Sequence, residues 1–400
     1  MNILVVSMMY APDNFRINEI TARLAAQGHN VTVLTGLPDY ATSRIPKEYR
    51  FWRRRRENIN GCRVVRVPTT ARRSGVFFRA VNYASFAVCG ALYARFCKKP
   101  QADVVFSFDT SPVFQVWPAA VFAKRLGVPL VVYCLDIWPE ALKAWGVGEG
   151  NPLFKAVRRI SRKLMCRADA VPVTSSPFIS YLTELGVAPD RLHYLPQDCD
   201  DAFGGEPPAP PAAKDTYDIY FCGNVGSVQR VDLLLQAAAK LPAQSGVRVH
   251  IVGDGSELQS CRDLAEQLGL GERAVFHGRL PQSQMPEMYA KADALAVTLR
   301  GGDFIGQTLP GKLQTYMCAG RPILACADGA TAETVAAADC GICVPSGQVD
   351  ALAEAMQRMA EQRDTFIQKG RNGRAYYEQH FTPDRFDAAL LALLEQTEVH

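Results

Sequence analysis

The sequence predicts an α/β protein with two doubly wound, mostly parallel sheets, each covered by helices on both faces. Short apolar strands alternate with helices through residues 1–197. A segment rich in proline and glycine interrupts this pattern at 198–217, and the alternation resumes over 218–375. The 400 residues also exceed what one hydrophobic core usually serves. We therefore expect an N-terminal domain, a linker and a C-terminal domain, then a helix within 376–400 that packs back on the N-terminal domain.

The N-terminal segments are apolar runs of strand length separated by helical patterns. The predicted strands are Ile3–Ser7, Val31–Thr35, Val64–Val67, Val104–Ser107, Leu130–Leu135 and Ala170–Thr174. The predicted helices are Phe15–Gln27, Ala119–Leu126 and Phe154–Arg167. Strands that are apolar throughout are typical of a parallel sheet buried on both faces.

The C-terminal segments repeat this arrangement after Gly204–Pro211, a stretch too stiff and polar for a core. The predicted strands are Asp218–Cys222 and Val247–Val252, and the predicted helices are Val231–Lys240 and Leu258–Leu268. Ser256 and Gln259 have the spacing of a capping box for the second helix. Thr382 and Pro383 are the predicted N-cap and first-turn proline of the final helix.

Charge is distributed unevenly along the chain. The net charge of the chain is +4. Residues 1–200 carry +12, from 27 Lys/Arg and 15 Asp/Glu, whereas residues 201–400 carry −8, from 17 Lys/Arg and 25 Asp/Glu. Arg50–Arg79 holds ten arginines and one acidic residue, with Phe and Trp between them. The apolar stretch Val76–Phe96 contains Arg79 and Arg95, so it is a poor membrane span. We predict that the region Arg50–Phe96 binds an anionic membrane surface. A nucleic-acid surface is disfavoured, because no nucleic-acid module is present, and a solvated or core-packed segment is the remaining alternative.

The cysteines and the start of the chain indicate the compartment. The twelve cysteines have no framework spacing, and Met1 leads straight into a strand without a signal-peptide pattern, so we expect a cytoplasmic chain with reduced thiols. Cys340 and Cys343 form a C-x-x-C, but their apolar surroundings favour structural thiols over redox chemistry.

Two segments of the C-terminal half have the chemistry of a phosphate site. The loop before Lys312 is rich in glycine and proline and leads into a helix, whose N-terminus and first-turn lysine would both attract an anion. Gly223-Asn224-Val225-Gly226 follows a strand, and its glycines would let backbone approach a diphosphate closely. The alternatives are a core helix with a solvated lysine, and a plain tight turn.

Acidic residues end two strands of the N-terminal half. Asp136 and Glu140 follow one strand and Asp109 follows another, where ligands of parallel sheets bind. They would position an acceptor group or accept its proton, unless they only cap helices and brace the sheet. Arg16 lies in a first helical turn, where a cation is unfavourable, and we interpret it as a ligand for the donor diphosphate. Asp198-Cys199-Asp200 is a literal D-x-D, but its position at the domain junction argues against a metal site.

Several of these motifs resemble one enzyme family. Family-4 glycosyltransferases of the GT-B fold are resembled by Pro310–Tyr316 with Cys318–Pro322, by the opening Tyr10–Asn18 and by Leu135–Glu140. The branch that they resemble contains bacterial N-acetylfucosamine transferases of O-antigen and capsule assembly, and the resemblance covers residues 1–375. It implies two Rossmann-like domains that face each other across a cleft. Many family members carry two glutamates where this chain has Gln307 and Thr315, and the named branch also lacks them.

The resemblance assigns expected roles to the motif residues. The residues expected at the donor diphosphate are Arg16, Gly223, Asn224, Gly226, Gln229, Arg230, Leu309, Pro310 and Lys312. Those expected at the nucleoside are Gly253, Asp254, Arg279, Leu280 and Thr315, with Gln307 at the sugar. Asp109, Asp136 and Glu140 are the catalytic candidates on the acceptor side. No metal or other cofactor is expected, because basic groups and helix dipoles would stabilise the leaving diphosphate.

Together with the sequence, the resemblance implies a metal-independent hexosyltransferase at the cytoplasmic face of the inner membrane; retention of the anomeric configuration is implied by the resemblance alone. It would move a sugar from a UDP-linked donor, such as a UDP-N-acetyl-deoxysugar, to a polyprenyl diphosphate-linked saccharide in capsule, O-antigen or exopolysaccharide synthesis. The alternatives are a GT-B sugar-nucleotide epimerase and a non-catalytic partner subunit of a glycosyltransferase.

Overall fold

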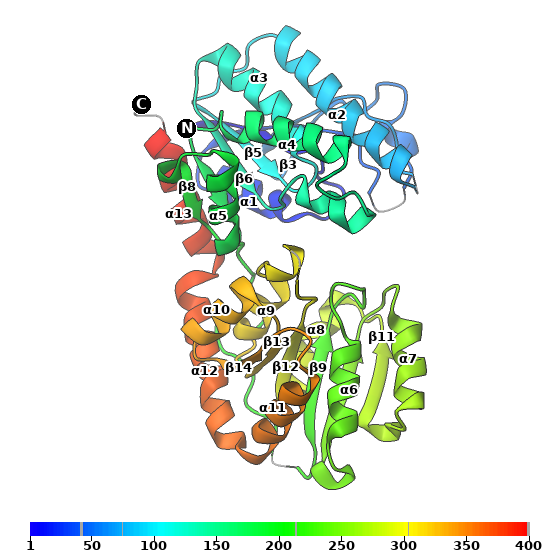
Figure 1. Ribbon diagram of the computed structural model, residues 1–400. Helices are drawn as coiled ribbons and strands as arrows, with labels where there is room; N and C mark the ends of the chain where they lie inside the picture. Colours follow the sequence, from blue (N-terminus) through cyan, green and yellow to red (C-terminus); the bar gives the residue numbers. More distant parts are fainter. Residues whose placement is uncertain (41–42, 74, 213, 303, 398–400) are drawn as a thin grey trace. The chain divides into compact units, whose positions relative to one another are not determined.

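The computed structural model describes residues 1–40, 43–73, 75–212, 214–302 and 304–397 (Figure 1). Its chain forms two compact units. The N-terminal unit contains Met1–Thr174, Phe178–Leu195 and the described residues from Asp387 onward, and the C-terminal unit contains Ser175–Pro177 and Pro196–Phe386. The predicted fold class, two α/β domains with parallel sheets, is confirmed.

The N-terminal unit is built on an eight-stranded sheet in the order β3-β4-β2-β1-β5-β6-β7-β8. Its strands are β1 (Asn2–Val6), β2 (Asn30–Thr35), β3 (Arg56–Ile59), β4 (Cys62–Arg66), β5 (Val104–Asp109), β6 (Leu130–Cys134), β7 (Val171–Val173) and β8 (Leu192–Tyr194). The central strands pair in parallel, so Ile3 aligns with Val31 of β2 and with Val104 of β5. The hairpin β3–β4 is antiparallel and turns at Asn60-Gly61, both with positive φ. The carboxyl ends of β1, β2, β5 and β6 therefore share one edge.

Helices cover both faces of this sheet. They are α1 (Arg16–Ala26), α2 (Val76–Phe96), α3 (Val116–Leu126), α4 (Pro152–Met165), α5 (Ser176–Leu185) and α13 (Pro383–Gln396). Short 3₁₀ turns are η1 (Lys47–Tyr49), η2 (Val113–Gln115), η3 (Glu140–Trp145) and η4 (Pro189–Arg191). Right-handed crossovers place α1 on the face opposite α2 and α3, which pack on each other (Figure 1). An ion pair at 2.8 Å between Arg23 of α1 and the buried Asp387 fixes α13.

The C-terminal unit contains a six-stranded parallel sheet in the order β11-β10-β9-β12-β13-β14. Its strands are β9 (Tyr217–Cys222), β10 (Val247–Val252), β11 (Ala274–Gly278), β12 (Ala294–Thr298), β13 (Ile323–Cys326) and β14 (Gly341–Val344). Its helices are α6 (Asp232–Lys240), α7 (Leu258–Gln267), α8 (Met285–Lys291), α9 (Gly311–Cys318), α10 (Gly329–Ala337), α11 (Val349–Glu361) and α12 (Arg363–His380). Its 3₁₀ turns are η5 (Ala243–Ser245), η6 (Gly271–Arg273), η7 (Gln282–Gln284) and η8 (Ile305–Gln307).

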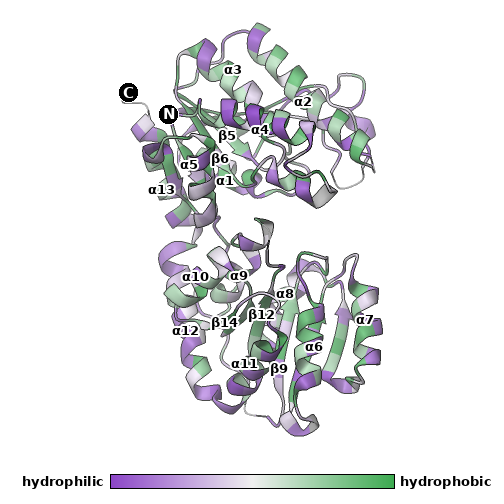
Figure 2. Cartoon of the chain, in the orientation of Figure 1, coloured by the Kyte–Doolittle hydropathy of each residue, from purple (hydrophilic) through white to green (hydrophobic). Residues whose placement is uncertain are grey.

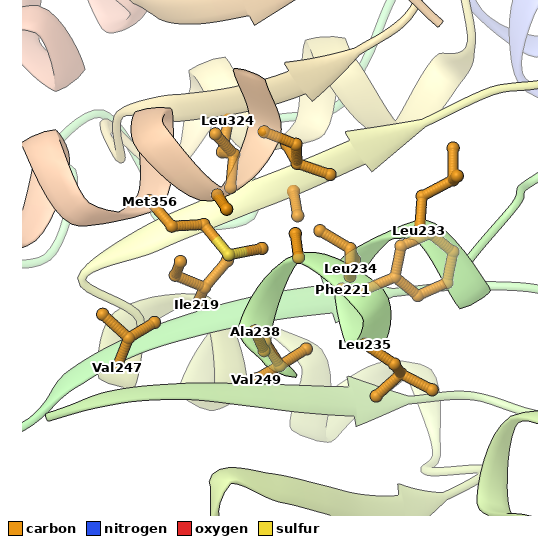
Figure 3. Packing of buried hydrophobic residues seen from close by; sticks show 14 of the residues in the cluster. Ile219, Phe221, Leu233, Leu234, Leu235, Ala238, Val247, Val249, Leu324 and Met356 are labelled. Carbon is orange, nitrogen blue, oxygen red and sulfur yellow. The ribbon is translucent and has the colours of Figure 1, made fainter. Parts of the chain in front are cut away.

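Each face of the second sheet has its own hydrophobic core. Ile219 and Phe221 of β9, Leu234 of α6 and Met356 of α11 meet on one face (Figure 3). On the other face, Leu313 and Tyr316 of α9 pack with residues of α8 and α12. Figure 2 shows the corresponding hydrophobic strands between helices with hydrophilic outer surfaces. Helix α9 is therefore held between the sheet and α12.

The segment that the sequence sets apart as a linker packs on the C-terminal unit. Arg321 donates hydrogen bonds to the carbonyl oxygens of Pro208 and Ala209, at 3.2 and 2.7 Å. The amide of Cys199 donates to the oxygen of Phe381 at 2.8 Å, and Gln314 donates to the oxygen of Gln197 at 2.7 Å. Residues before 218 therefore cover α9 and the end of α12.

Two local predictions have different outcomes. The cap of the final helix is confirmed, because the amide of Arg385 donates to Thr382 Oγ1 at 3.4 Å. The capping box of α7 is wrong, since that helix begins at Leu258 after Glu257 and has no side-chain cap. The amide of Glu257 instead donates to the oxygen of Val225, so tertiary contacts fix this helix start. All twelve cysteines are free, Cys340 and Cys343 included.

Candidate active site

Three glycine turns lie stacked at the carboxyl ends of β9, β10 and β11. The amide of Gly223 donates to the oxygen of Val252 at 2.8 Å, and the amide of Gly253 donates to the oxygen of Gly278 at 2.8 Å. A Cβ on Gly253 would lie 1.8 Å from the oxygen of Gly223, and Gly253 has a φ of +150°. Only glycine permits this approach. The turns form a wall of bare backbone at the edge where parallel sheets bind ligands.

Lys312 lies directly beside this wall. Its Nζ lies 3.8 Å from the centroid of the Phe221 ring. If Gly223 carried a side chain, its Cβ would be 3.4 Å from this Nζ. One turn further along α9, the hydroxyl of Tyr316 donates to the oxygen of Cys222 and accepts from its amide, both at 2.9 Å. Since Lys312 and Tyr316 are four residues apart, they share a helix face. Tyr316 thereby fixes α9 to the end of β9 and sets the position of the lysine.

The ammonium group of Lys312 is buried without an ionic partner. Its Nζ is inaccessible to solvent and forms no hydrogen bond within the described part of the chain. Desolvation lowers the pKa of Lys312 to about 8, which the nearby Cys222 thiol only partly opposes. A desolvated cation beside a glycine-rich turn is suited to an anion that replaces the lost water.

A pocket of about 530 Å³ opens next to the glycine turns. The residues that line it come from the ends of β9–β11, from η7 and from α8: Cys222, Gly223, Asn224, Val252, Gly253, Asp254, Arg279, Leu280, Gln282, Met285 and Tyr289. The pocket therefore contains four of the five residues predicted to bind the nucleoside. The fifth, Thr315, does not line it, because its hydroxyl donates to the oxygen of Gly311 at 3.3 Å and lies 3.3 Å from Cys199 Sγ.

The remaining predicted donor residues surround the turn after β9. Asn224 donates to Gln229 Oε1 at 3.1 Å, and both side chains lie against Gly226. Arg230 has a φ of +42° and forms a two-pronged ion pair with Asp232, at 2.9 Å for both contacts. Because Asp232 already binds it, Arg230 would have to exchange partners in order to contact a diphosphate.

Gln307 and Leu309 lie in the loop before α9. The amide of Leu309 donates to the hydroxyl of Ser175 at 2.9 Å, and Pro310 is the N-cap of α9. A Cβ on Gly329, at the start of α10, would be 2.8 Å from the Cβ of Gln307. Gln307 is thus packed against the beginning of α10.

In the N-terminal unit, two carboxyl groups occupy the ends of neighbouring strands. Asp109 ends β5 and is fully buried, with Oδ1 accepting from Gln115 at 3.1 Å and Oδ2 unpaired among the described residues. Burial, with a smaller effect from Asp136, raises the pKa of Asp109 to about 8. Burial also raises the pKa of Asp136 to about 6, against hydrogen bonds from Trp138 and Ser111. At neutral pH the pair therefore holds about one proton, mostly on Asp109.

The two other predicted residues of this unit are engaged in ion pairs. Glu140 is buried and lies 2.6 Å from Lys143 Nζ, which also contacts Glu149 at 2.8 Å. Arg16 begins α1 and forms an ion pair with Glu19 of the same helix. The local acid offsets the unfavourable position of Arg16 in the first turn.

Some site residues were missed by the sequence reasoning. Met285 and Tyr289 have the spacing of ordinary core positions, and nothing local distinguishes them, whereas Tyr316 lies in the motif Pro310–Tyr316 but had no predicted role. Gln115, which also accepts from the amide of Met8 at 3.1 Å, links the ends of β1 and β5 but lies in a short 3₁₀ turn without a motif. In the described ranges, no group of three or more His, Cys, Asp or Glu side chains could hold a metal ion.

Comparison with known proteins assigns this arrangement to a class. Residues 14–198 match the family described as glycosyl transferase 4-like domain, and residues 206–375 match glycosyl transferases group 1. WcaI of Escherichia coli (strain K12), named as a putative colanic acid biosynthesis glycosyl transferase, is 25% identical over 80% of this chain and 82% of its own. The GDP-mannose-dependent alpha-(1-6)-phosphatidylinositol monomannoside mannosyltransferase of Mycobacterium tuberculosis is 26% identical over 61% of this chain and 66% of its own.

Solved structures share the fold. HepE of Anabaena in complex with UDP superposes with a TM-score of 0.72 at 16% identity, over 99% of this chain and 100% of that one. Sucrose-phosphate synthase of Thermosynechococcus elongatus gives a TM-score of 0.73 at 19% identity, over 99% and 98%. The chain therefore belongs to the glycosyltransferases that combine a 4-like domain with a group 1 domain, and its fold is GT-B.

Proposed function

We propose that this chain is a retaining, metal-independent hexosyltransferase of surface polysaccharide synthesis. It transfers the sugar of a UDP-linked donor, an N-acetyl-deoxysugar or a related sugar, to a saccharide carried on a lipid diphosphate. The proposed branch is the one that the sequence resembles, that of the N-acetylfucosamine transferases. The observation that carries the proposal is the buried, unpaired ammonium of Lys312, fixed by Tyr316 beside the glycine turn at Gly223.

The donor site is proposed from charge and shape together. The diphosphate would lie along the amides of the glycine turn and against Lys312, which would stabilise the charge that develops on the leaving UDP. The adjacent pocket of about 530 Å³ would take the nucleoside, with Arg279 and Leu280 at its rim. HepE forms a complex with UDP, whereas the mycobacterial relative is named for GDP-mannose, so both nucleotides belong in the test.

The acceptor side is proposed at Asp109 and Asp136. In the transfer, the bond between the sugar C1 and the diphosphate oxygen breaks and a bond from C1 to the acceptor oxygen forms. The acceptor hydroxyl proton then passes to Asp136, which is largely ionised at neutral pH, or to the leaving diphosphate. Asp109, protonated at that pH, would donate a hydrogen bond to the acceptor and keep the pair from carrying two charges.

A peripheral position on an anionic membrane fits the N-terminal unit. Phe77, Val88, Leu92 and Phe96 of α2 are exposed, and Figure 2 shows this helix as mainly hydrophobic. Among the described helices, α2 alone is long and apolar enough to cross a membrane, and length and composition by themselves are weak evidence for a span. With Arg79 and Arg95 in it, the helix is better suited to lie in the interface between lipid headgroups and chains.

Calorimetric titration of UDP and GDP, with and without EDTA, tests the donor site. We expect UDP binding that survives EDTA and is weakened about ten- to a hundredfold in Lys312→Met. The control Lys240→Met, which alters a surface lysine paired with Asp350, should bind UDP normally. Absence of binding for both nucleotides would contradict the proposal. UDP release without acceptor would favour an epimerase, and binding without turnover on any lipid-linked saccharide would favour a partner subunit that lacks the two glutamates.

A further inference from the structure

A second charged pocket lies in the N-terminal unit, apart from Asp109 and Asp136. It has a volume of about 810 Å³ and is lined by Ser43, Arg44, Ile45, Arg50, Ala71 and Arg73. Three of these six residues are arginines, and no acidic residue is among them. Three guanidinium groups around one opening repel each other, so the pocket is electrostatically prepared for a polyanion.

Two loops form this pocket, and a buried acid holds them together. Ser43–Arg50 follows β2, whereas Ala71 and Arg73 lie between β4 and α2, so both loops leave the carboxyl edge of the sheet. Asp39 accepts hydrogen bonds from the amide of Arg72 at 2.6 Å and from Asn82 at 3.0 Å. The carboxylate thereby joins the loop after β2 to the segment before α2.

Ring stacking orders the same region further. The ring of Tyr40 contacts Phe15 edge to face, with 4.9 Å between centroids, and the guanidinium of Arg72 lies 4.7 Å from its centroid. Asp13 accepts from the amides of Asp39 and Tyr40 at 3.2 and 3.0 Å. Arg50 donates to the oxygen of Ile45 at 2.9 Å, which closes the loop on itself. The backbone that carries Arg73 is therefore tied to a packed framework through Arg72, and Arg50 is tied to its own loop, while the arginine side chains themselves are exposed.

Exposed aromatic side chains begin at the edge of the pocket. The guanidinium carbon of Arg73 lies 5.8 Å from the ring of Phe78, which contacts Phe77 edge to face at 5.7 Å. Phe77 is 72% exposed and Phe78 44% exposed. The arginine pocket and the exposed aromatic rings are therefore neighbours. Such a surface suits an amphipathic molecule that carries its negative charge at one end.

We propose that the pocket of Arg44, Arg50 and Arg73 binds the diphosphate of the lipid-linked acceptor, with Phe77 and Phe78 against the first units of its hydrocarbon chain. The inference rests on the proposed function and specifies where the acceptor's anionic head lies. Guanidinium groups bind phosphate oxygens in pairs, and three of them match the charge of a diphosphate better than that of a single phosphodiester. The headgroups of bulk phospholipid would instead contact the basic region Arg50–Phe96 as a whole, because attraction to an anionic membrane needs no fixed arrangement of arginines.

Binding of farnesyl diphosphate and of inorganic pyrophosphate to the purified full chain tests this assignment. The pocket variant is Arg44→Gln/Arg50→Gln/Arg73→Gln. The matched control, Arg53→Gln/Arg54→Gln/Arg56→Gln, removes the same charge from residues that do not line the pocket. We expect at least about tenfold weaker binding of both probes in the pocket variant and little change in the control. Phe77→Ser/Phe78→Ser should weaken farnesyl diphosphate binding and leave pyrophosphate binding unchanged.

Vesicles of phosphatidylcholine with phosphatidylglycerol separate the two sources of phosphate. We expect both triple variants to lose vesicle binding to a similar degree, since it depends on total charge. Equal loss of farnesyl diphosphate binding in both triple variants would overturn the proposal and leave a general basic surface. Tryptophan fluorescence reports on the folding of the N-terminal unit in each variant, and UDP binding reports on the donor site. Farnesyl diphosphate that fails to bind while UDP binds overturns this inference alone, whereas absent UDP binding overturns the proposed function.

Discussion

Replacing Lys312 by methionine should stabilise the protein while weakening its binding of UDP. Methionine keeps the unbranched stem that packs in α9 but removes the ammonium. Burial lowers the pKa of Lys312 to about 8, against about 10.4 for a lysine in water, which corresponds to a cost of about 3 kcal/mol at pH 7. The variant also loses the contact between Nζ and the Phe221 ring, at 3.8 Å, which contributes about 1–2 kcal/mol. We expect a net gain of about 1–2 kcal/mol in the free energy of unfolding.

The stability gain of Lys312→Met should depend on pH, because it comes from removing a buried ammonium that titrates. Between pH 8 and 10.4 the unfolded chain binds a proton at Lys312 that the folded chain does not, so wild-type stability rises with pH across this interval. The advantage of Lys312→Met should therefore shrink as the pH rises through it. In the same variant, UDP affinity should fall by about ten- to a hundredfold, as expected for a lost charge-assisted contact.

Urea denaturation followed with two probes separates a gain in the stability of the C-terminal unit from a change in the N-terminal unit. All four tryptophans, at 52, 117, 138 and 145, belong to the N-terminal part of the sequence, so their fluorescence reports on that unit. Circular dichroism reports on both units. We expect a later transition by dichroism and an unchanged one by fluorescence, with Lys240→Met as the surface control. A C-terminal unit that becomes less stable in Lys312→Met at pH 7 would refute the argument that its ammonium is desolvated and unpaired.

Three further predictions concern the same site. Raising the pH from 7 to 9 should weaken UDP binding by about tenfold as Lys312 loses its proton, and Lys312→Arg should bind with no such dependence in calorimetric titrations. Tyr316→Phe should cost about 1–3 kcal/mol in the free energy of unfolding, because the backbone of Cys222 loses a donor and an acceptor, and should also weaken UDP binding; a fully wild-type variant would show that this hydroxyl does not position α9. Gly253→Ala should abolish UDP binding and destabilise by more than about 3 kcal/mol, because its Cβ would meet the oxygen of Gly223, whereas Gly269→Ala, which faces open space, should cost only about 1 kcal/mol in the same denaturation assay.

Strands β1, β5 and β6 could be predicted because they are nearly uninterrupted apolar runs, whereas β12, a central strand of the second sheet, was not among the predicted strands. Strand β4 was predicted as Val64–Val67, but β3 and its pairing with β4 were missed, since β3 lies at the sheet edge and begins with Arg56, although Asn60-Gly61 is a strong turn signal. The capping box at Ser256 failed for a different reason. The start of α7 is fixed by the backbone of Val225, which is distant in sequence and leaves no local pattern.

The candidate site could be predicted where it depends on local motifs and not where it depends on packing. Glycine turns and a first-turn lysine are visible in sequence, so Gly223, Gly253 and Lys312 were identified. Lys312 is buried and unpaired because α9 packs against the end of β9, which is distant from it in sequence. No local sequence pattern predicts this contact. The anchoring of α9 by Tyr316 depends on the same meeting, so it had no signal of its own.

The packing of residues 196–217 determines where the C-terminal half could be exchanged between related enzymes. A chimera joined at 218, where the first strand begins nearby, would import a sheet whose helix α9 had lost Gln197 and whose Arg321 had lost Pro208 and Ala209. Such a hybrid would have to rebuild those contacts from a foreign segment. A junction at Pro196 transfers residues 196–217 together with the surface that they cover. The C-terminal unit that can be exchanged as a whole therefore begins before its first strand.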